Sequence, residues 1–315
     1  MLATTERQRR FAVLAWAVLG FTVLVALGGS VVRATGSGAG CGDHWPRCRG
    51  QILPTSPSLE TVIELTHRLT TAVAAVAFVA LVVLAFRVFG RRHPVRIAVV
   101  VSALLLVLEA LIGAALVRYG WVDADTSLGR LIVVPLHLAN TFLLLAALSL
   151  TAWWGSGHPP PTRLRWDGPT ARLATMAGLM LVVAVFGAWN ALADTLHPAQ
   201  SIADGLQAEL GDSSPFLVRV RVLHPAVAIG AGIAIAAMAF SIADGAAATT
   251  RRLGIAVVSI VVAQFALGAL NLFLLTPVET QVLHLAVADL LWITLVLFAA
   301  SVLSDVSAPE PAGVA

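Results

Sequence analysis

The sequence predicts an all-α polytopic membrane protein, in which eight transmembrane helices form two repeat-related four-helix bundles. Of its 315 residues, 58% are hydrophobic and only 12% are charged, against about 25% charged residues in an average soluble domain. The mean hydropathy of +0.89 agrees, because a water-facing globule needs more polar side chains to cover its surface. This composition excludes a disordered chain, a coiled coil and a secreted disulfide scaffold. The net charge of +3 does not predict nucleic-acid binding.

Eight apolar runs are long enough to cross the hydrocarbon core of a bilayer, which takes about 20 residues. The first run follows three arginines, as the apolar part of a signal peptide does. We expect it to be retained as a helix, because it exceeds the about 7–15 residues of such a signal and leads into further spans. The predicted spans are 11–33, 60–88, 95–117, 129–153, 171–192, 215–241, 253–274 and 280–303.

The placement of arginine predicts the orientation of the chain. Twelve arginines fall on the side of the membrane that holds the N-terminus, whereas acidic residues dilute the arginines on the opposite side. The positive-inside rule assigns the arginine-rich side to the cytoplasm, so we expect both termini there and the loops at 34–59 and 193–214 outside. The twelve are Arg7, Arg9, Arg10, Arg87, Arg91, Arg92, Arg96, Arg163, Arg165, Arg172, Arg251 and Arg252.

A linker rich in proline and glycine at about 156–170 divides the chain into two predicted domains, 1–160 and 161–315. The two halves resemble each other, because the sequence LHLA occurs at 136–139 and again at 283–286. Four spans are an even number, so both halves have the same orientation and the repeat is parallel.

Four histidines lie inside spans two, four, six and eight, all at a similar shallow depth near the outer face. A single histidine in a membrane helix is usually hydrogen-bonded to a neighbour, but two per bundle at one depth indicate binding sites. Zinc usually takes thiolate or carboxylate ligands as well, whereas a haem between apolar helices takes two axial imidazoles. The sequence therefore predicts two haem sites, formed by His67, His137, His224 and His284.

Glu64 lies three residues before His67 and so shares its helix face. A carboxylate within a span is costly unless it faces the bundle interior. Two interpretations remain open, a proton donor or acceptor beside a haem edge and a hydrogen bond to a neighbouring helix. The counterpart of Glu64 in the second half is Arg221. We therefore expect chemistry in the first bundle and electron storage or relay in the second.

Other polar residues of the spans have two interpretations as well. Arg68, Arg219 and Arg221 are candidates to pair with haem propionates, or else they extend to the membrane interface. Glu109 of the segment EALIGA has Gln264 of the segment QFALGA as its counterpart. An amide in place of the carboxylate favours a structural hydrogen bond over catalysis for Glu109.

Cys41 and Cys48 share the first outer loop, where an oxidising environment permits a disulfide. One interpretation is a structural staple. The other is a redox role in thiol exchange, which needs an accessible and labile bond.

The motifs resemble those of bacterial haem A synthase. They are GGSVVRATGSGAGCGDHWPRC at 28–48, ELTHR at 64–68, the two LHLA segments and the His-Pro at 224–225. The similarity covers about 11–303, and the chain is similar to the subgroup that carries a cysteine pair in the first extracytoplasmic loop.

This resemblance implies a bacterial plasma-membrane enzyme that oxidises the C8 methyl group of haem O to a formyl group for terminal cytochrome oxidases. It implies a haem b cofactor held by His224 and His284. It also implies that His67 and His137 bind the iron of the substrate, haem O, with Glu64 near the reacting edge.

The resemblance further implies haem O synthase, cytochrome oxidase assembly and membrane lipid as partners, and it leaves a homo-oligomer open. The alternative function is a non-enzymatic two-haem cytochrome b linked to quinol. Such a carrier would use the same four histidines and would need neither the carboxylate beside one haem nor the cysteine loop. A haem exporter or chaperone is a third hypothesis, and it would need a weakly held, accessible haem.

Overall fold

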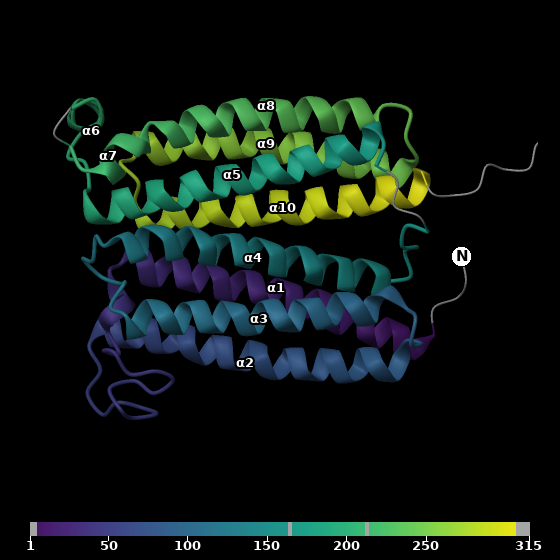
Figure 1. Cartoon of the computed structure of the whole chain (residues 1–315), viewed down its shortest axis with the longest axis horizontal. Helices are drawn as coiled ribbons and strands as arrows, with labels where there is room; N and C mark the ends of the chain where they lie inside the picture. The colour runs from purple at the N-terminus through teal and green to yellow at the C-terminus, as the bar shows by residue number, and fades with distance from the viewer. Residues whose placement is uncertain (1–4, 163–165, 212–213, 307–315) are drawn as a thin grey trace, which may run out of the picture.

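The computed structural model describes residues 5–162, 166–211 and 214–306, and over these ranges it is helical with no β-strand (Figure 1). Arg163 and Arg165 of the predicted cytoplasmic set lie outside the described residues. The helices are α1 (Glu6–Ala34), η1 (Ser37–Ala39), α2 (Leu59–Val88), α3 (Pro94–Arg118), α4 (Leu128–Gly155), α5 (Gly168–Leu196), α6 (Ile202–Glu209), α7 (Phe216–Arg221), α8 (Leu223–Ala243), α9 (Ala248–Phe273) and α10 (Val278–Val306).

Among the described residues, eight helical stretches are long and apolar enough to cross a membrane, which confirms the prediction of an all-α, multi-pass membrane protein. Each corresponds to one predicted span, and the sixth is formed by α7 and α8 together. The break between α7 and α8 falls at Val222. It lies three residues before Pro225, which has no N–H to donate to the carbonyl of Arg221.

Five helices that a polar residue caps begin earlier than hydropathy predicts, α1 by five residues, α5 by three and α2, α3 and α4 by one. The side chains of Thr5, Ser58, His93, Ser127 and Asp167 each accept a hydrogen bond from a backbone N–H in the first turn. Such caps satisfy donors that have no partner within the helix. Caps are polar and therefore extend the helices beyond the apolar runs.

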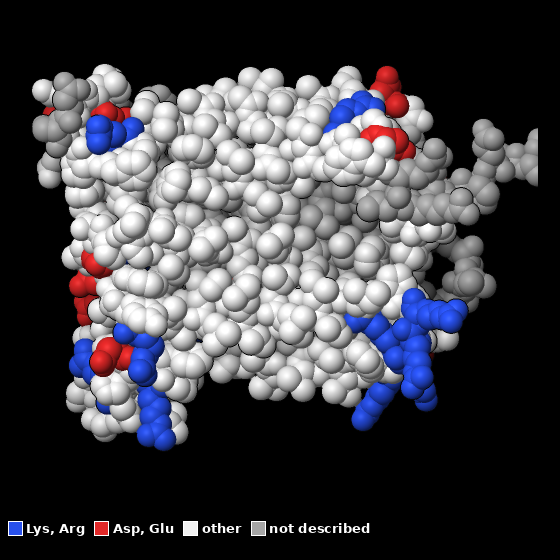
Figure 2. All heavy atoms as spheres, viewed as in Figure 1, with Lys and Arg blue, Asp and Glu red and all other residues white. Residues whose placement is uncertain are grey.

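The long helices run side by side in two groups, with α1 to α4 in one and α5, α8, α9 and α10 in the other (Figure 1). The first turn of α2, the last turn of α1 and the short helix α6 all lie at one end, which we call the disulfide end. Charged side chains gather at the two ends, and Figure 2 shows an uncharged band between them on the visible face. Such a band fits the hydrocarbon core of a bilayer.

The two groups pack through α1, α4, α5 and α10. At the centre, the rings of Phe142 on α4 and Trp292 on α10 stack with their centroids 5.5 Å apart, and the indole N–H of Trp292 donates to the carbonyl of Phe142 at 2.6 Å. The domain boundary at 160, the repeat and the cytoplasmic location of the termini stay predictions.

Arg33 connects the two groups near the disulfide end. Its Nη1 donates to the carbonyl of Ala191 and to Oγ1 of Thr195 on α5, both at 2.6 Å. Its Nη2 donates to Oε1 of Gln281 on α10 at 2.8 Å. Because hydrogen bonds from a charged donor are the stronger kind, Arg33 fastens α1 to two helices of the other group.

We expect Arg33→Ala to lower the free energy of unfolding by about 1.5–3 kcal/mol, the usual contribution of hydrogen bonds to a charged group. The measurement is thermal unfolding in detergent. Arg118→Ala is the matched control, because Arg118 is exposed at the end of α3. Equal unfolding temperatures for the two variants would contradict the connecting role of Arg33.

Candidate functional site

The four predicted histidines lie toward the disulfide end, each within the first ten residues of a span. His67 is on α2, His137 on α4, His224 on α8 and His284 on α10. The rings of His224 and His284 lie edge to face, with centroids 6.5 Å apart and planes at 85°. His67 and His137 belong to one helical group, on α2 and α4. The structure therefore brings His224 and His284 together and places His67 and His137 in the other group at the same end.

Each of these histidine rings packs against a glycine of a neighbouring helix, a feature that sequence reasoning missed. The glycines belong to α1, α3, α5 and α9, which precede the histidine helices along the chain. A methyl group in place of a glycine hydrogen would approach Cε1 of the ring closely, most of all on α1 and α5. The distances from such a methyl carbon to Cε1 of the ring are 3.1 Å for Gly29 and His67, 3.9 Å for Gly113 and His137, 3.1 Å for Gly187 and His224, and 3.4 Å for Gly268 and His284.

All four histidines have a buried Nδ1 atom that makes no hydrogen bond to the described residues. Nδ1 of His137 does lie 3.2 Å from Oε1 of Glu109. Buried polar atoms without a partner are rare and often mark a site for an ion or another missing group. Imidazole is the commonest metal ligand in proteins, so these rings have the chemistry to hold a metal centre in each pair.

Glu64 is 3% exposed and lies beneath the loop that contains the disulfide. The backbone N–H of Cys41 donates to its Oε2 at 2.7 Å, and the Nε of Arg68 donates to its Oε1 at 3.0 Å. Nη2 of Arg68 forms a further short ion pair with the same oxygen. The carboxylate therefore joins α2 to the loop rather than to a neighbouring helix. Its predicted catalytic role stays a prediction.

Cys41 and Cys48 form a disulfide, and both side chains are fully buried. The loop is held against α2, because Nη1 of Arg68 donates to the carbonyls of His44 and Arg47 at 2.7 and 2.9 Å. The structure thus confirms the bond itself. Its role as a staple or as a redox group stays a prediction.

Gly40 lies against the first turn of α2. Oγ1 of Thr61 donates to its carbonyl at 2.7 Å. A side chain at residue 40 would collide with the backbone of Glu60 and Thr61. Only glycine therefore lets the disulfide loop lie this close to the helix that carries Glu64 and His67.

Arg221 is buried at the corresponding place in the second half. Its Nε lies 3.3 Å from Asp194 and 3.9 Å from Glu209, and its Nη2 donates to the carbonyls of Ala193 and His197 at 3.0 and 2.8 Å. Burial raises the pKa of Glu209, and the charge of Arg221 opposes that shift.

The three arginines proposed for haem propionates thus differ in their surroundings. Arg68 and Arg221 are engaged with carboxylates and carbonyls of the protein, whereas Arg219 is exposed. The propionate assignment stays a prediction for all three.

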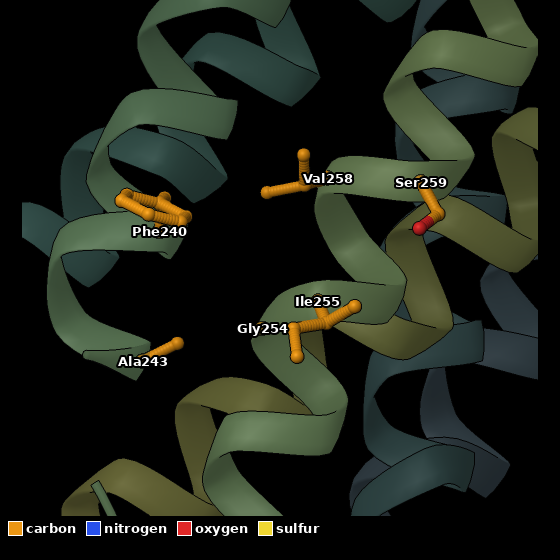
Figure 3. A pocket seen from close by; sticks show the side chains of 6 residues that line it. All are labelled: Phe240, Ala243, Gly254, Ile255, Val258 and Ser259. Atoms are coloured by element: carbon orange, nitrogen blue, oxygen red, sulfur yellow. The ribbon is translucent and has the colours of Figure 1, made fainter. Parts of the chain in front are cut away.

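A separate cavity of about 180 Å³ lies between α8 and α9, where α8 ends and α9 begins (Figure 3). It is lined by Phe240, Ala243, Gly254, Ile255, Val258 and Ser259. This lining is almost wholly apolar and contains no titratable group. The cavity lies at the end opposite to the histidines and does not belong to their site.

Comparison with known proteins gives two kinds of relative. Proteins from two strains of Thermus thermophilus, each named protoheme IX farnesyltransferase, are 43% identical over 302 residues, which is 95% of this chain and 49% of the relative. A heme A synthase of Bacillus cereus strain AH187 is 35% identical over 128 residues, 41% of this chain and 39% of the relative. The chain thus spans about half the length, or less, of these curated relatives.

A family model described as cytochrome oxidase assembly protein, COX15-CtaA, matches residues 12–296. That match includes all four histidines, their four glycines, Glu64 and the disulfide. Because it extends over nearly the whole chain, the chain belongs to the COX15-CtaA family of cytochrome oxidase assembly proteins.

Proposed function

We propose that the chain is a haem A synthase, a membrane oxidoreductase that converts the C8 methyl group of haem O to a formyl group. The observation that carries this proposal is the set of four histidines, each seated on a glycine and each with a buried ring nitrogen that has no hydrogen-bond partner among the described residues. Membership of the family and the similarity to the heme A synthase of Bacillus cereus support it.

The residues present fit a haem at the second pair of histidines. Two imidazoles on opposite sides of one metal, each bonded at about 2 Å, place their ring centres about 6 Å apart. The centroids of His224 and His284 are 6.5 Å apart. We assign this pair to a resident haem b, which when bound supplies one-electron redox chemistry.

The substrate haem O is assigned to the first pair, His67 and His137. Glu64 is one side chain that distinguishes this half, since Arg221 takes the corresponding place in the other half and is paired with Asp194. Glu64 is fixed by the N–H of Cys41 and by Arg68. Held one helical turn from His67, its carboxylate is positioned to accept or return a proton at the reacting edge of the substrate.

The surroundings of the enzyme follow from the same proposal. The arginine pattern favours the bacterial plasma membrane with cytoplasmic termini. The relatives from Thermus thermophilus carry the similar segment in 49% of a chain that is named protoheme IX farnesyltransferase. This arrangement supports a haem O synthase as the partner that supplies the substrate, and the family description supports a role in cytochrome oxidase assembly.

Pigment extraction from the purified protein tests this function. We expect haem b together with haem O or haem A, whereas haem b alone in both sites would favour the two-haem electron carrier. His224→Ala and His284→Ala should each remove the haem b, because each imidazole is half of the protein ligation of the iron. His67→Ala and His137→Ala should retain haem b and abolish haem A formation. Wild-type haem A yields in either of these last two variants would contradict the substrate site.

Glu64→Gln should lower haem A formation on the order of 100-fold, the usual contribution of a general acid or base. The amide retains the size but cannot take up and release the proton, and its single oxygen can accept from Cys41 or from Arg68 but not from both. Haem A is quantified by chromatography from a host that lacks its own enzyme, and haem b content reports the fold. Glu60→Gln is the matched control, because Glu60 is exposed one turn earlier on α2. Haem A at the wild-type level would end the catalytic assignment.

Replacing both Cys41 and Cys48 by serine should leave the fold and the haem b in place and reduce turnover only in part. The free energy of unfolding should fall by about 2–3 kcal/mol, because the bond closes a short loop in the unfolded chain. Turnover, pigment and thermal unfolding are measured on one preparation. Turnover at background with haem b intact would instead assign electron entry to the pair, and full wild-type turnover would exclude both roles.

A further inference from the structure

Glu109 is an acidic side chain in the middle of a predicted span, and it contacts a histidine of the site. Its Oε1 lies 3.2 Å from Nδ1 of His137. Two donors on the same helix as His137 hold the carboxylate: Nδ2 of Asn140 donates to Oε2 at 2.5 Å, and Oγ1 of Thr141 forms a short hydrogen bond to Oε1. The carboxylate is therefore aimed at the ring by a dedicated set of hydrogen bonds.

In the second half an amide takes the place of the carboxylate, and it lies at Nε2 of its histidine rather than at Nδ1. Nε2 of Gln264 lies 3.1 Å from Nε2 of His284 and 3.1 Å from the carbonyl of the same residue. In the LHLA segments, the residues that correspond to Asn140 and Thr141 are Val287 and Ala288, which have no polar side chain. The carboxylate and its two donors thus occur together in the first half and are absent together from the second.

The difference between the two contacts has a chemical consequence for an iron ligand. A carboxylate that accepts the ring N–H of a metal-bound histidine fixes the ring and raises the basicity of the ligand, and loss of such a partner typically costs about 10–100-fold in affinity or activity. A neutral amide fixes the ring without adding negative charge, whichever way its oxygen and nitrogen are turned.

We propose that Glu109 is a positioning residue that makes His137 the more basic iron ligand, and that Gln264 keeps the ligand field at His284 neutral. This inference rests on the proposed haem sites. The charge at Glu109 would favour ferric over ferrous haem in the first bundle, since negative charge stabilises the more positive iron. The neutral Gln264 would leave the haem of the second bundle with the higher midpoint potential. An electron stored there would then stay on that haem rather than pass to the first bundle.

The test isolates one haem at a time in the full chain. In a His224→Ala background only the first bundle is loaded, with ferric protohaem as the probe, and its midpoint potential is measured by optical redox titration. Glu109→Gln should raise this potential by about 59 mV, which is a tenfold change for a one-electron couple. An unchanged potential overturns the proposal, because a merely structural role would be preserved by the amide.

The control variant removes a buried carboxylate that contacts no histidine. Asp289 on α10 is 1% exposed, and its carboxylate oxygens have no hydrogen-bond partner among the described residues. Asp289→Asn should leave the potential unchanged. A shift equal to that of Glu109→Gln would mean that loss of any buried carboxyl group suffices, which also overturns the proposal.

The reciprocal exchange provides a second measurement. In a His67→Ala background, Gln264→Glu combined with Val287→Asn and Ala288→Thr transfers the carboxylate with its donors and should lower the potential of the haem at His284 by a similar amount. An unchanged potential there contradicts the proposal. Failure of the background proteins to bind any haem would instead count against the proposed function, so the two failures are distinguishable.

Discussion

The close approach of a glycine to each histidine ring sets the geometry on which the candidate site depends. A methyl carbon added at Gly29 or Gly187 would lie 3.1 Å from Cε1 of the facing ring, which is tighter than an ordinary contact, whereas one at Gly268 or Gly113 would lie at 3.4 or 3.9 Å, within ordinary contact distance. The contacts at Gly29 and Gly187 therefore restrict how α2 and α8 can be rotated about their axes. Because an apolar membrane offers no water to solvate a misplaced ring, that rotation determines which nitrogen atoms remain available for a ligand.

Within this shared geometry, the two halves differ in charge. Glu64 and Glu109 place carboxylates near the first pair of histidines, whereas Arg221 and Gln264 take the corresponding positions in the second half. Charges within a membrane are costly and usually functional. The charged residues here are tied to neighbours, Glu64 to the disulfide loop and Arg221 to Asp194. The second half has buried carboxylates of its own, Asp194 and Glu209, but these lie beside Arg221, whereas Glu109 of the first half contacts a histidine.

The eight spans were predictable because the length of an apolar run directly reports the thickness that a helix must cross. The four histidines were predictable because polar residues stand out in such runs. The contacts between helices could not be predicted, because they depend on how each helix is rotated about its axis and how deep it lies in the membrane. Hydropathy does not encode either of these. The contacts at Gly29 and Gly187 and the pairing of Arg221 with Asp194 therefore came only from the structure. The Cys41–Cys48 bond, which the sequence left open, needed the geometry of the loop.

The contacts between the two helical groups have a consequence for how the groups can move. Arg33 crosses between the groups with three hydrogen bonds, and Trp292 is bonded to Phe142 across the same interface. Separating the groups to admit a large flat molecule would break all of these contacts at once. A rearrangement at either pair of histidines that keeps these contacts must therefore come from the helices outside the interface between the groups, α2, α3, α8 and α9.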